Sequence, residues 1–284
     1  MSALLPEWKN TKFIIIGMLH LGALPGAPLF DGDLDRVRDT LLRDADALAE
    51  GGVDGLMIEN FGDVPFFPGR APAHVVAQIT ALAQLVRQRV PQVPLGINVL
   101  RNDGQSALAI AHAVGASYIR VNVLCGARVT DQGVIQGIAH DLLRERAILD
   151  PKRSIKIFAD VDVKHSAPLA RRELVDEVDD TRQRGLADAL IVSGAGTGKA
   201  TDPAHVAAVK RAAGDTPVFI GSGVSVATIN AYRSSCDGVI VGTALKRDGV
   251  ASNEVDVARV REMVARVHSP NPVSEAAQKK TPRD

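Results

Sequence analysis

Short runs of apolar residues recur along the chain, and each is followed by glycine-rich or polar residues and then by a helical pattern. Most of the runs are rich in valine and isoleucine. Near-continuous apolarity is typical of parallel strands, because both faces of such a strand are buried. The pattern predicts eight strands: Phe13–Met18, Gly55–Ile58, Leu95–Val99, Tyr118–Val123, Ile155–Val161, Ala189–Val192, Val218–Ile220 and Gly238–Val241.

Amphipathic helical stripes fill several of the gaps between these runs. Asp202 followed by Pro203 predicts a helix N-cap with proline at the first helical position. Gly51 and Gly52 stand where the first helix should end. The apolar positions that recur at helical spacing are Leu34, Val37, Leu41, Ala45 and Leu48; Val76, Ile79, Leu82 and Val86; Leu174 and Val178; and Val257, Val260, Val264 and Val267.

Strands that alternate with helices predict a parallel sheet, and eight strands can close it into a barrel. A weakly similar sequence segment leads into every second predicted strand. This internal repeat fits a barrel built from four βαβα units. The length of 284 residues also suits one (β/α)₈ barrel. We therefore predict a single-domain α/β TIM barrel over residues 12–268, with an open doubly wound sheet as the alternative. Residues 1–11 form an N-terminal extension, and the polar tail 269–284 is expected to be disordered.

Charge and composition narrow the functional classes. Lys plus Arg equals Asp plus Glu, at 33 each, which argues against a general nucleic-acid binder. The N-terminus lacks the basic start of a signal peptide, and the run Phe13–Met18 is too short to span a bilayer. The expected location is the cytoplasm, with no membrane insertion. The two cysteines, Cys125 and Cys236, suggest neither a disulfide framework nor a zinc site.

Polar residues gather where the predicted strands end, and in this fold the active site lies at those carboxyl ends. We predict four catalytic residues, Glu59, Asp160, Asp162 and Lys164. The other polar residues at these ends are predicted to bind substrate: His20, Asn60, Asn98, Arg120, Asn122, His165 and Ser193.

Side-chain alternation places Arg120 and Asn122 on one face of their strand. If the extended conformation continues, Asp160, Asp162 and Lys164 also share a face. A charge inside an apolar strand is costly unless it is paired or functional. The alternative to a substrate-binding role is therefore a structural ion pair between Arg120 and either Asp160 or Glu59.

Three glycine-rich turns follow the last three strands, at 193–199, 221–224 and 242–246. Glycine lets backbone N–H groups approach an anion closely, and barrels often bind phosphate at the loops after strands seven and eight. Ordinary tight turns are the alternative. The first turn is not a Walker A motif, since Ser193 occupies its first glycine position and Ala200 replaces the hydroxyl residue that would bind magnesium. It is not a G-x-G-x-x-G motif either, since its glycines fall at positions 194, 196 and 198. The predicted phosphate-binding residues are Gly194, Gly196, Thr197, Gly198, Ser222, Gly223, Gly242 and Thr243.

The chemistry at strand five has several alternatives. A desolvated Lys164 can form a Schiff base with a carbonyl substrate. Alternatively, Asp160 or Asp162 acts as general base while Lys164 stabilises an oxyanion, with Glu59 as a second acid or base. A divalent metal is a third option, held by those three carboxylates and His165. The remaining alternative is that Lys164 and His165 are simply solvated at the surface.

Six motifs together resemble the BtpA/SgcQ family: Gly17–Gly26, Met57–Asp63, Asn98–Asn102, Ile119–Asn122, Asp160–His165 and Gly221–Val224. The resemblance covers roughly residues 12–268, nearly the whole predicted barrel. It implies a ribulose-phosphate-binding-type barrel. Some members of that family are described as factors for photosystem I biogenesis, and others occur in sugar-utilisation operons. This chain carries Asp162 where many relatives have a histidine, which weakens a metal role there.

Two functional classes follow. The first is an enzyme that acts on a phosphorylated sugar or nucleoside-like molecule by isomerase, aldolase or lyase, or hydrolase chemistry. The second is a non-catalytic assembly factor that retains a phosphate pocket. Charged strand ends favour the enzyme, because assembly alone does not need them. A homo-oligomer is expected by analogy with other barrels. The central prediction is that the turns near residues 194–198, 222–224 and 243–244 meet at one cavity.

Overall fold

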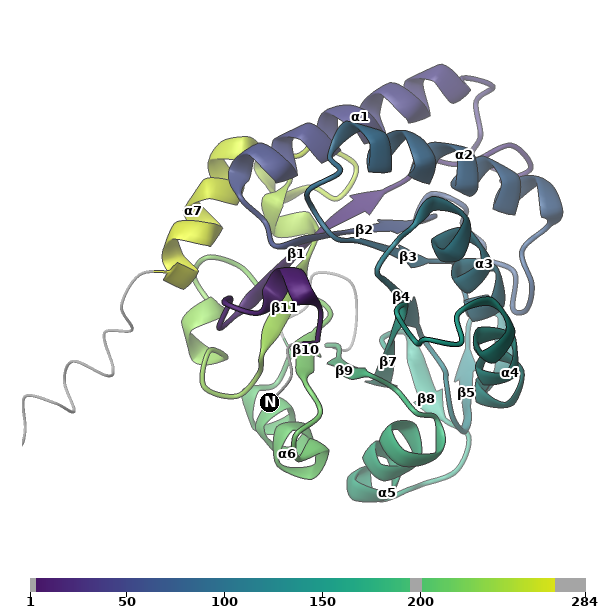
Figure 1. Cartoon of the computed structure of the whole chain (residues 1–284), viewed down its shortest axis with the longest axis vertical. Coiled ribbons are helices and arrows are strands. Elements are labelled where there is room, and N and C mark those ends of the chain that lie inside the picture. Colours follow the sequence, from purple (N-terminus) through teal and green to yellow (C-terminus); the bar gives the residue numbers. More distant parts are fainter. Residues whose placement is uncertain (1–3, 195–200, 269–284) are drawn as a thin grey trace, which may run out of the picture.

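The computed structural model describes residues 4–194 and 201–268, apart from the side chain of Asp162. Within these residues, eight parallel strands close a barrel (Figure 1), in the order β1-β11-β10-β9-β7-β4-β3-β2. The predicted TIM barrel is therefore confirmed. Each predicted apolar run lies on one barrel strand: β1 (Ile14–His20), β2 (Gly55–Glu59), β3 (Leu95–Asn98), β4 (Tyr118–Val121), β7 (Lys156–Asp162), β9 (Ala189–Val192), β10 (Val218–Ile220) and β11 (Gly238–Val241).

Helices surround the barrel on the outside (Figure 1). The predicted stop of α1 is confirmed, since Gly52 follows the helix with a φ of 89°. The predicted cap of α6 is confirmed as well, because the Asp202 side chain accepts a hydrogen bond from the backbone N–H of Ala204. The α-helices are α1 (Leu34–Gly51), α2 (Ala73–Arg89), α3 (Gly104–Val114), α4 (Ala139–Leu149), α5 (Leu174–Asp179), α6 (Pro203–Ala213) and α7 (Val257–His268).

Several connections are shorter helical turns. The π-helical turn η2 (Asp180–Arg184) continues α5. A single 3₁₀ turn, η3 (Ile229–Ala231), stands after β10, and η4 (Thr243–Leu245) and η5 (Arg247–Gly249) follow β11. The chain therefore leaves β10 and β11 through irregular turns, which lie at the carboxyl end of the barrel.

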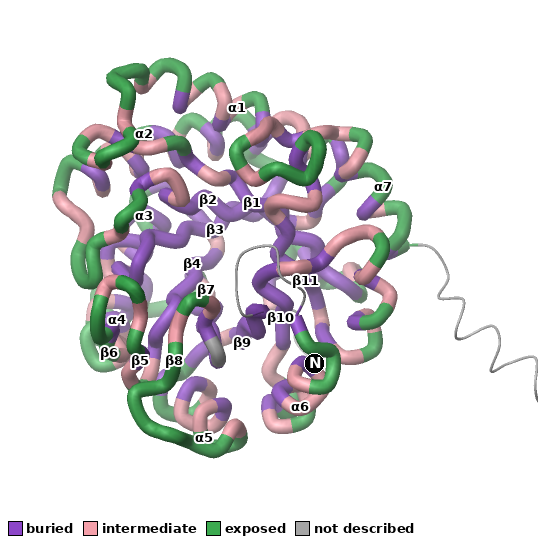
Figure 2. The backbone as a smooth tube through the Cα atoms, turned by 180° about the vertical axis from the view of Figure 1, so that it is seen from behind, coloured by how far each residue is buried: buried purple, intermediate pink, exposed green. Residues whose placement is uncertain are grey.

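The main hydrophobic core lies between the barrel and its helices. Figure 2 shows the strands buried along their length, while the outer sides of the helices are exposed. Outward-facing strand residues such as Ile15, Ile58 and Val239 belong to this core, and all three are fully buried. Burial on both strand faces explains why the barrel strands read as nearly continuous apolar runs.

A second apolar cluster fills the lower part of the barrel interior. The N-terminal turn η1 (Pro6–Trp8) inserts Trp8, whose ring centroid lies 5.6 Å from that of Tyr118 and 6.3 Å from those of Phe158 and Phe219. The Trp8 indole also donates a 2.7 Å hydrogen bond to the backbone oxygen of Asp54, just before β2. These contacts lie at the amino ends of the strands, so Trp8 plugs the bottom of the barrel.

A small antiparallel sheet stands beside the barrel, with the order β6-β5-β8. Its strands are β5 (Ala127–Thr130), β6 (Gly133–Gln136) and β8 (Ser166–Pro168). The apolar pattern did not predict this sheet, because its strands are short and mostly exposed. This sheet matters for the site because its strand β8 begins two residues after Lys164.

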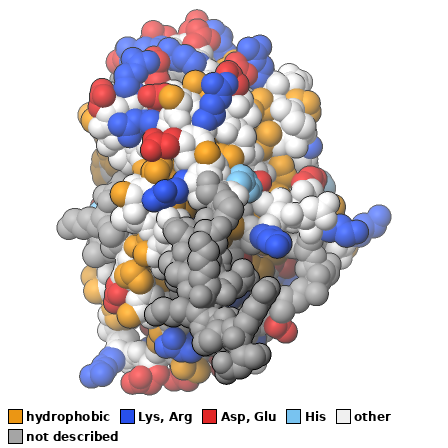
Figure 3. Space-filling model, turned by 90° about the vertical axis from the view of Figure 1, so that its left-hand side faces the viewer, with side chains coloured by type: hydrophobic (Ala, Val, Ile, Leu, Met, Phe, Trp, Pro, Cys, Tyr) orange, Lys and Arg blue, Asp and Glu red, His pale blue; other side chains and the backbone are white. Residues whose placement is uncertain are grey.

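Charge is mixed over the visible surface. On the face in Figure 3, basic and acidic side chains lie interspersed.

Across the described ranges 4–194 and 201–268, no helix combines the length and apolarity needed to cross a bilayer. Cys125 and Cys236 are both free thiols.

Candidate functional site

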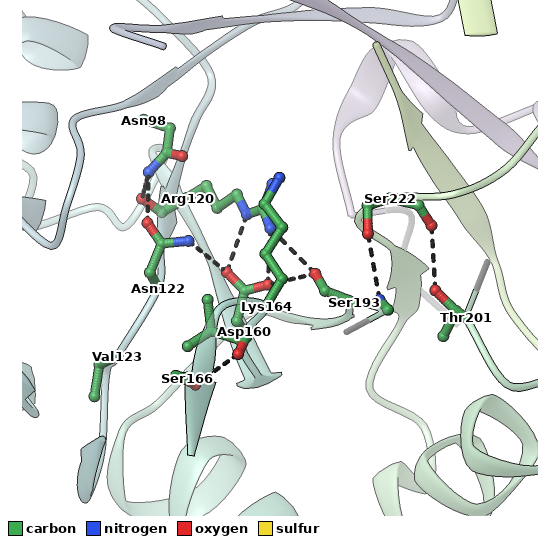
Figure 4. A network of polar contacts seen from close by, with 12 residues as sticks. Asn98, Arg120, Asn122, Val123, Asp160, Lys164, Ser166, Ser193, Thr201 and Ser222 are labelled. Atoms are coloured by element: carbon green, nitrogen blue, oxygen red, sulfur yellow. Dashed lines mark hydrogen bonds and ion pairs between the residues drawn. The ribbon is translucent and has the colours of Figure 1, made fainter. Parts of the chain in front are cut away.

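A layer of polar side chains lies above the apolar plug, at the carboxyl ends of the strands. At its centre, the guanidinium of Arg120 donates to both carboxylate oxygens of Asp160, at 3.0 and 2.8 Å (Figure 4). The same carboxylate accepts from the Asn122 amide at 2.9 Å and from the Ser193 hydroxyl at 3.1 Å. Both Arg120 and Asp160 are almost completely buried.

Arg120 and Asn122 share the inward face of β4, as expected from side-chain alternation. The ion pair between Arg120 and Asp160, which the sequence offered as the alternative to a substrate-binding role, is also present. The members of this network come from β4, from β7 and from the residue after β9, so it joins three neighbouring strand ends. Four hydrogen bonds satisfy the Asp160 carboxylate, which removes much of the cost of burying its charge.

A cavity of about 310 Å³ lies above one side of this layer. It is enclosed by residues from β1, β2, β4, the segment after β7, and the turns after β10 and β11. Its lining residues are Met18, His20, Glu59, Arg120, Lys164, Gly221, Ser222, Gly223, Val224, Ser225, Thr228, Ile240, Val241, Gly242, Thr243 and Ala244. Sequence-predicted catalytic, substrate-binding and phosphate-binding residues thus meet at one cavity.

Backbone atoms form much of the wall on the side of β10 and β11. Glycine has no side chain, so Gly221, Gly223 and Gly242 line the cavity with their backbones alone. Gly223 has a φ of 75°, the left-handed region that favours glycine. A Cβ atom on Gly221 would lie 2.7 Å from the Ser193 hydroxyl and 3.0 Å from the Arg120 guanidinium. The close approach of this turn to the polar layer therefore requires glycine.

The turn after β9 lies beside the turn after β10. The backbone N–H of Gly194 donates a 3.2 Å hydrogen bond to the Ser222 hydroxyl, and the Thr201 hydroxyl donates to the Ser222 carbonyl at 3.1 Å (Figure 4). The turns at 222–224 and 243–244 therefore line one cavity, and Gly194 adjoins it through its hydrogen bond to Ser222. Gly196, Thr197 and Gly198 lie outside the described residues.

Lys164 reaches the cavity from just beyond β7. The strand ends at Asp162, and its register against β9 shifts between Asp160 and Asp162. The chain then bends, and His165 has a φ of 58°. The extended conformation thus does not continue to Lys164. The Arg101 guanidinium instead fixes the bend by donating a 2.6 Å hydrogen bond to the Lys164 carbonyl. Burial lowers the pKa of the Lys164 amine, while the nearby Glu59 charge opposes that shift.

Glu59 and His20 face Lys164 from the opposite strands. Glu59 is buried, and one of its carboxylate oxygens lies 3.9 Å from His20 Nε2, too far for a hydrogen bond. Burial lowers the pKa of His20 to about 4, against the opposing effect of Glu59, so the imidazole is neutral near neutral pH. Its ring stacks on Phe61 at a centroid distance of 4.4 Å. Within the described part of the chain, His20 Nδ1 is buried without a hydrogen-bond partner.

Other predicted substrate-binding residues support the site from behind. Asn98 donates to the Arg120 carbonyl at 3.1 Å and to the Asn122 side chain at 3.3 Å. Asn60 accepts from the backbone N–H of Leu100 and donates to Asp63, so it orders loops rather than lining the cavity. His165 is exposed.

The structure adds residues that sequence reasoning did not select. Gly221 belongs to a recognised glycine turn, and its close approach to Arg120 was not evident from that turn alone. Arg101 lies three residues beyond the end of β3 and beside Asn102 and Asp103, which was the available signal for its role. Among the side chains that the structure describes, no three His, Cys, Asp or Glu residues gather as a metal ion would require.

Fold and site together define a (β/α)₈ barrel with a small, polar, glycine-walled cavity at the carboxyl end. The chain belongs to the BtpA family, whose model matches residues 11–269. An uncharacterized protein of Thermococcus kodakarensis is 48% identical over 250 residues, which cover 88% of this chain and 93% of that protein. The photosystem I biogenesis protein BtpA of Synechocystis sp. is 45% identical over 250 residues, covering 88% and 86%.

Solved structures support the fold. Phosphoribosyl anthranilate isomerase from Thermus thermophilus aligns with a TM-score of 0.53 at 13% identity, covering 90% of this chain and 98% of that one. The structure of native KDPGal aligns with a TM-score of 0.55 at 16% identity, covering 95% and 98%. At these identities, the likeness establishes the barrel alone.

Proposed function

We propose that this protein is an enzyme that acts on a phosphorylated small molecule bound in the 310 Å³ cavity. One observation carries the proposal: glycine-rich turns suited to an oxyanion and the two ionisable side chains Glu59 and Lys164 line the same cavity. The phosphate binds against 221–225 and 242–244, and the reacting part of the molecule faces Glu59 and Lys164.

The turns after β10 and β11 have the chemistry that a phosphate needs. Three glycines expose backbone there, and the hydroxyl residues Ser222, Ser225, Thr228 and Thr243 stand among them. Backbone N–H groups and hydroxyls are good donors to phosphate oxygens. Lys164 adds a positive charge to the lining when it is protonated, and this charge favours an anion further, whereas the charge of Arg120 is already paired with Asp160.

Carbonyl chemistry through Lys164 fits this site best. A lowered pKa increases the unprotonated fraction of the amine, which attacks a carbonyl carbon and releases water to give a Schiff base. Glu59 faces the same space and serves as the acid or base that moves the proton. Four hydrogen bonds hold the Asp160 carboxylate, so we assign Asp160 to positioning Arg120 rather than to proton transfer.

Borohydride trapping tests this chemistry. The protein is incubated with dihydroxyacetone phosphate, glyceraldehyde 3-phosphate or ribulose 5-phosphate, reduced, and mapped by mass spectrometry, while calorimetry records binding. We expect a covalent adduct on Lys164 that disappears in Lys164→Met and persists in the control Lys156→Met. Binding without an adduct would remove the Schiff base. Failure of phosphate and of every sugar phosphate to bind would remove the phosphate cavity.

An assembly factor is the second candidate, because the chain is 45% identical to a relative named as a photosystem I biogenesis protein. Complementation of a Synechocystis strain that lacks its own BtpA separates the two candidates. Folded Glu59→Gln and Lys164→Met variants that complement fully would favour the assembly role. Loss of complementation by both variants would favour the enzyme. A cytoplasmic location and a homo-oligomeric state stay part of the proposal.

A further inference from the structure

A second and larger hollow adjoins the phosphate cavity. This groove, of about 960 Å³, lies between the segments after β1, β2 and η4 and the first turns of α1. Its lining residues are His20, Leu21, Gly22, Ala23, Leu29, Asp31, Arg36, Val37, Thr40, Phe61, Gly62, Val64, Lys246, Arg247, Asp248, Ala251, Ser252, Asn253 and Glu254. The groove lies at the carboxyl end of the barrel, where ligands of this fold bind.

His20 is the wall that the two spaces share. It lines both the cavity and the groove, and its ring stacks on Phe61, which lines the groove. The His20 side chain is only 9% exposed, and its Nδ1 has no hydrogen-bond partner among residues 4–194 and 201–268. A molecule that extended from the cavity into the groove would therefore pass His20.

The groove favours an uncharged group. Its basic side chains already have acidic partners: Arg247 pairs with Glu254 at 3.2 Å, Lys246 pairs with Asp44, and Arg36 pairs with Asp31. Positive charge in the groove is thus neutralised by the protein itself, and Asp248 adds a negative charge to the lining. A second phosphate group would find little attraction there.

The remaining walls suit a flat ring. Leu21 and Val37 are buried and apolar, and Phe61 presents an aromatic ring. Uncharged polar side chains, Thr40, Ser252 and Asn253, stand beside them. Apolar walls with a few hydrogen-bonding groups are typical of ligand pockets, and an aromatic wall can stack on a planar ring.

From this arrangement we infer that the ligand is bipartite: its phosphate occupies the cavity, and an uncharged planar ring occupies the groove beyond His20. The inference rests on the proposed phosphate cavity and narrows its substrate class. The substrate is then a ring-bearing sugar phosphate rather than a simple sugar phosphate.

Calorimetric binding of three kinds of probe tests the inference: inorganic phosphate, ribose 5-phosphate, and the ring-bearing adenosine and uridine 5′-monophosphates. At least one nucleotide is expected to bind about tenfold or more tightly than ribose 5-phosphate. Ala251→Trp places a bulky side chain in the groove wall. It should abolish that advantage and leave the affinity for ribose 5-phosphate unchanged. Ala170→Trp, at an exposed position outside both linings, is the matched control.

Each outcome decides a separate point. If ribose 5-phosphate binds and neither nucleotide binds more tightly, the ring site is wrong and the phosphate cavity stands. If no probe binds, the cavity and the ring site fall together. Loss of self-association in Ala251→Trp, with nucleotide affinity intact, would show that a second copy of the chain occupies the groove, and would overturn the inference.

Discussion

Arg120 and Asp160 lie 40 positions apart in the sequence and form a two-point ion pair inside the barrel, with N–O distances of 3.0 and 2.8 Å. Their side chains are 2% and 0% exposed, so solvent screens the pair very little. The pair lies at the centre of the polar layer, and removing either member would leave an uncompensated charge buried inside the barrel.

Loss of one member should destabilise the fold strongly. Asp160→Ala leaves a buried guanidinium without its partner, and we expect the free energy of unfolding to fall by about 3–5 kcal/mol. Urea denaturation measures this change. The control is Asp46→Ala, which breaks an exposed pair with Arg89 and should cost about 1 kcal/mol or less. Equal effects in the two variants would contradict the structural role of Asp160.

Gly242 should tolerate no side chain without a loss of binding. An added Cβ atom would lie 2.7 Å from Cε1 of His20, so Gly242→Ala must displace the imidazole and narrow the cavity. We expect the affinity for ribose 5-phosphate, measured by calorimetry, to fall about tenfold or more. Gly69→Ala is the control, because a Cβ atom there meets nothing within 4 Å. Unchanged affinity in Gly242→Ala would place the ligand elsewhere.

The buried His20 predicts a specific loss of stability in acid. Burial lowers its pKa from the ordinary value of 6.5 to about 4, so the fold favours the neutral imidazole. The resulting stabilisation is fully present above about pH 6.5 and is lost as the pH falls toward 4, by up to about 3 kcal/mol. Urea denaturation at a series of pH values measures the slope.

A variant isolates this effect from other acid-sensitive groups. His20→Phe should unfold with a shallower decline between about pH 6.5 and pH 4 than the natural protein. His140→Gln removes an exposed histidine and should leave the slope unchanged. The same slope in His20→Phe and the natural protein would show that His20 is not the titrating group.

The N-terminal plug should matter for folding. Trp8→Ala empties the space among Tyr118, Phe158 and Phe219, and large-to-small changes of this kind cost about 3–5 kcal/mol. Thermal or urea unfolding checks the loss. Leu29→Ala, at a residue that is 68% exposed, serves as the control and should change stability by about 0.5 kcal/mol or less. A small effect in Trp8→Ala would show that the barrel is closed without the plug.

The barrel strands could be predicted because each is buried on both faces, which leaves an apolar run in the sequence. Local chemistry also marked helix ends, as at Gly52 and Asp202. The polar strand ends indicated the site for a similar reason: charged residues such as Arg120 interrupt an apolar strand only where a partner or a ligand compensates for burial.

Other features depend on contacts that no local pattern encodes. Arg101 meets the carbonyl of Lys164 across 63 positions, and that contact exists only once the barrel has closed. The bend after β7 requires a positive φ at His165, and a histidine in the sequence does not by itself predict that backbone conformation. Trp8 precedes the first strand in a short polar stretch, so only the three-dimensional structure shows that it enters the barrel.

The Trp8 plug also determines where a ligand can enter and leave the barrel. With Trp8 and its aromatic neighbours filling the amino end, the interior formed by the described residues opens at the opposite rim. In the proposed enzyme, substrate and product would use this same opening, so bound product would have to leave before the next substrate binds. Product that dissociates slowly would then limit the rate of turnover.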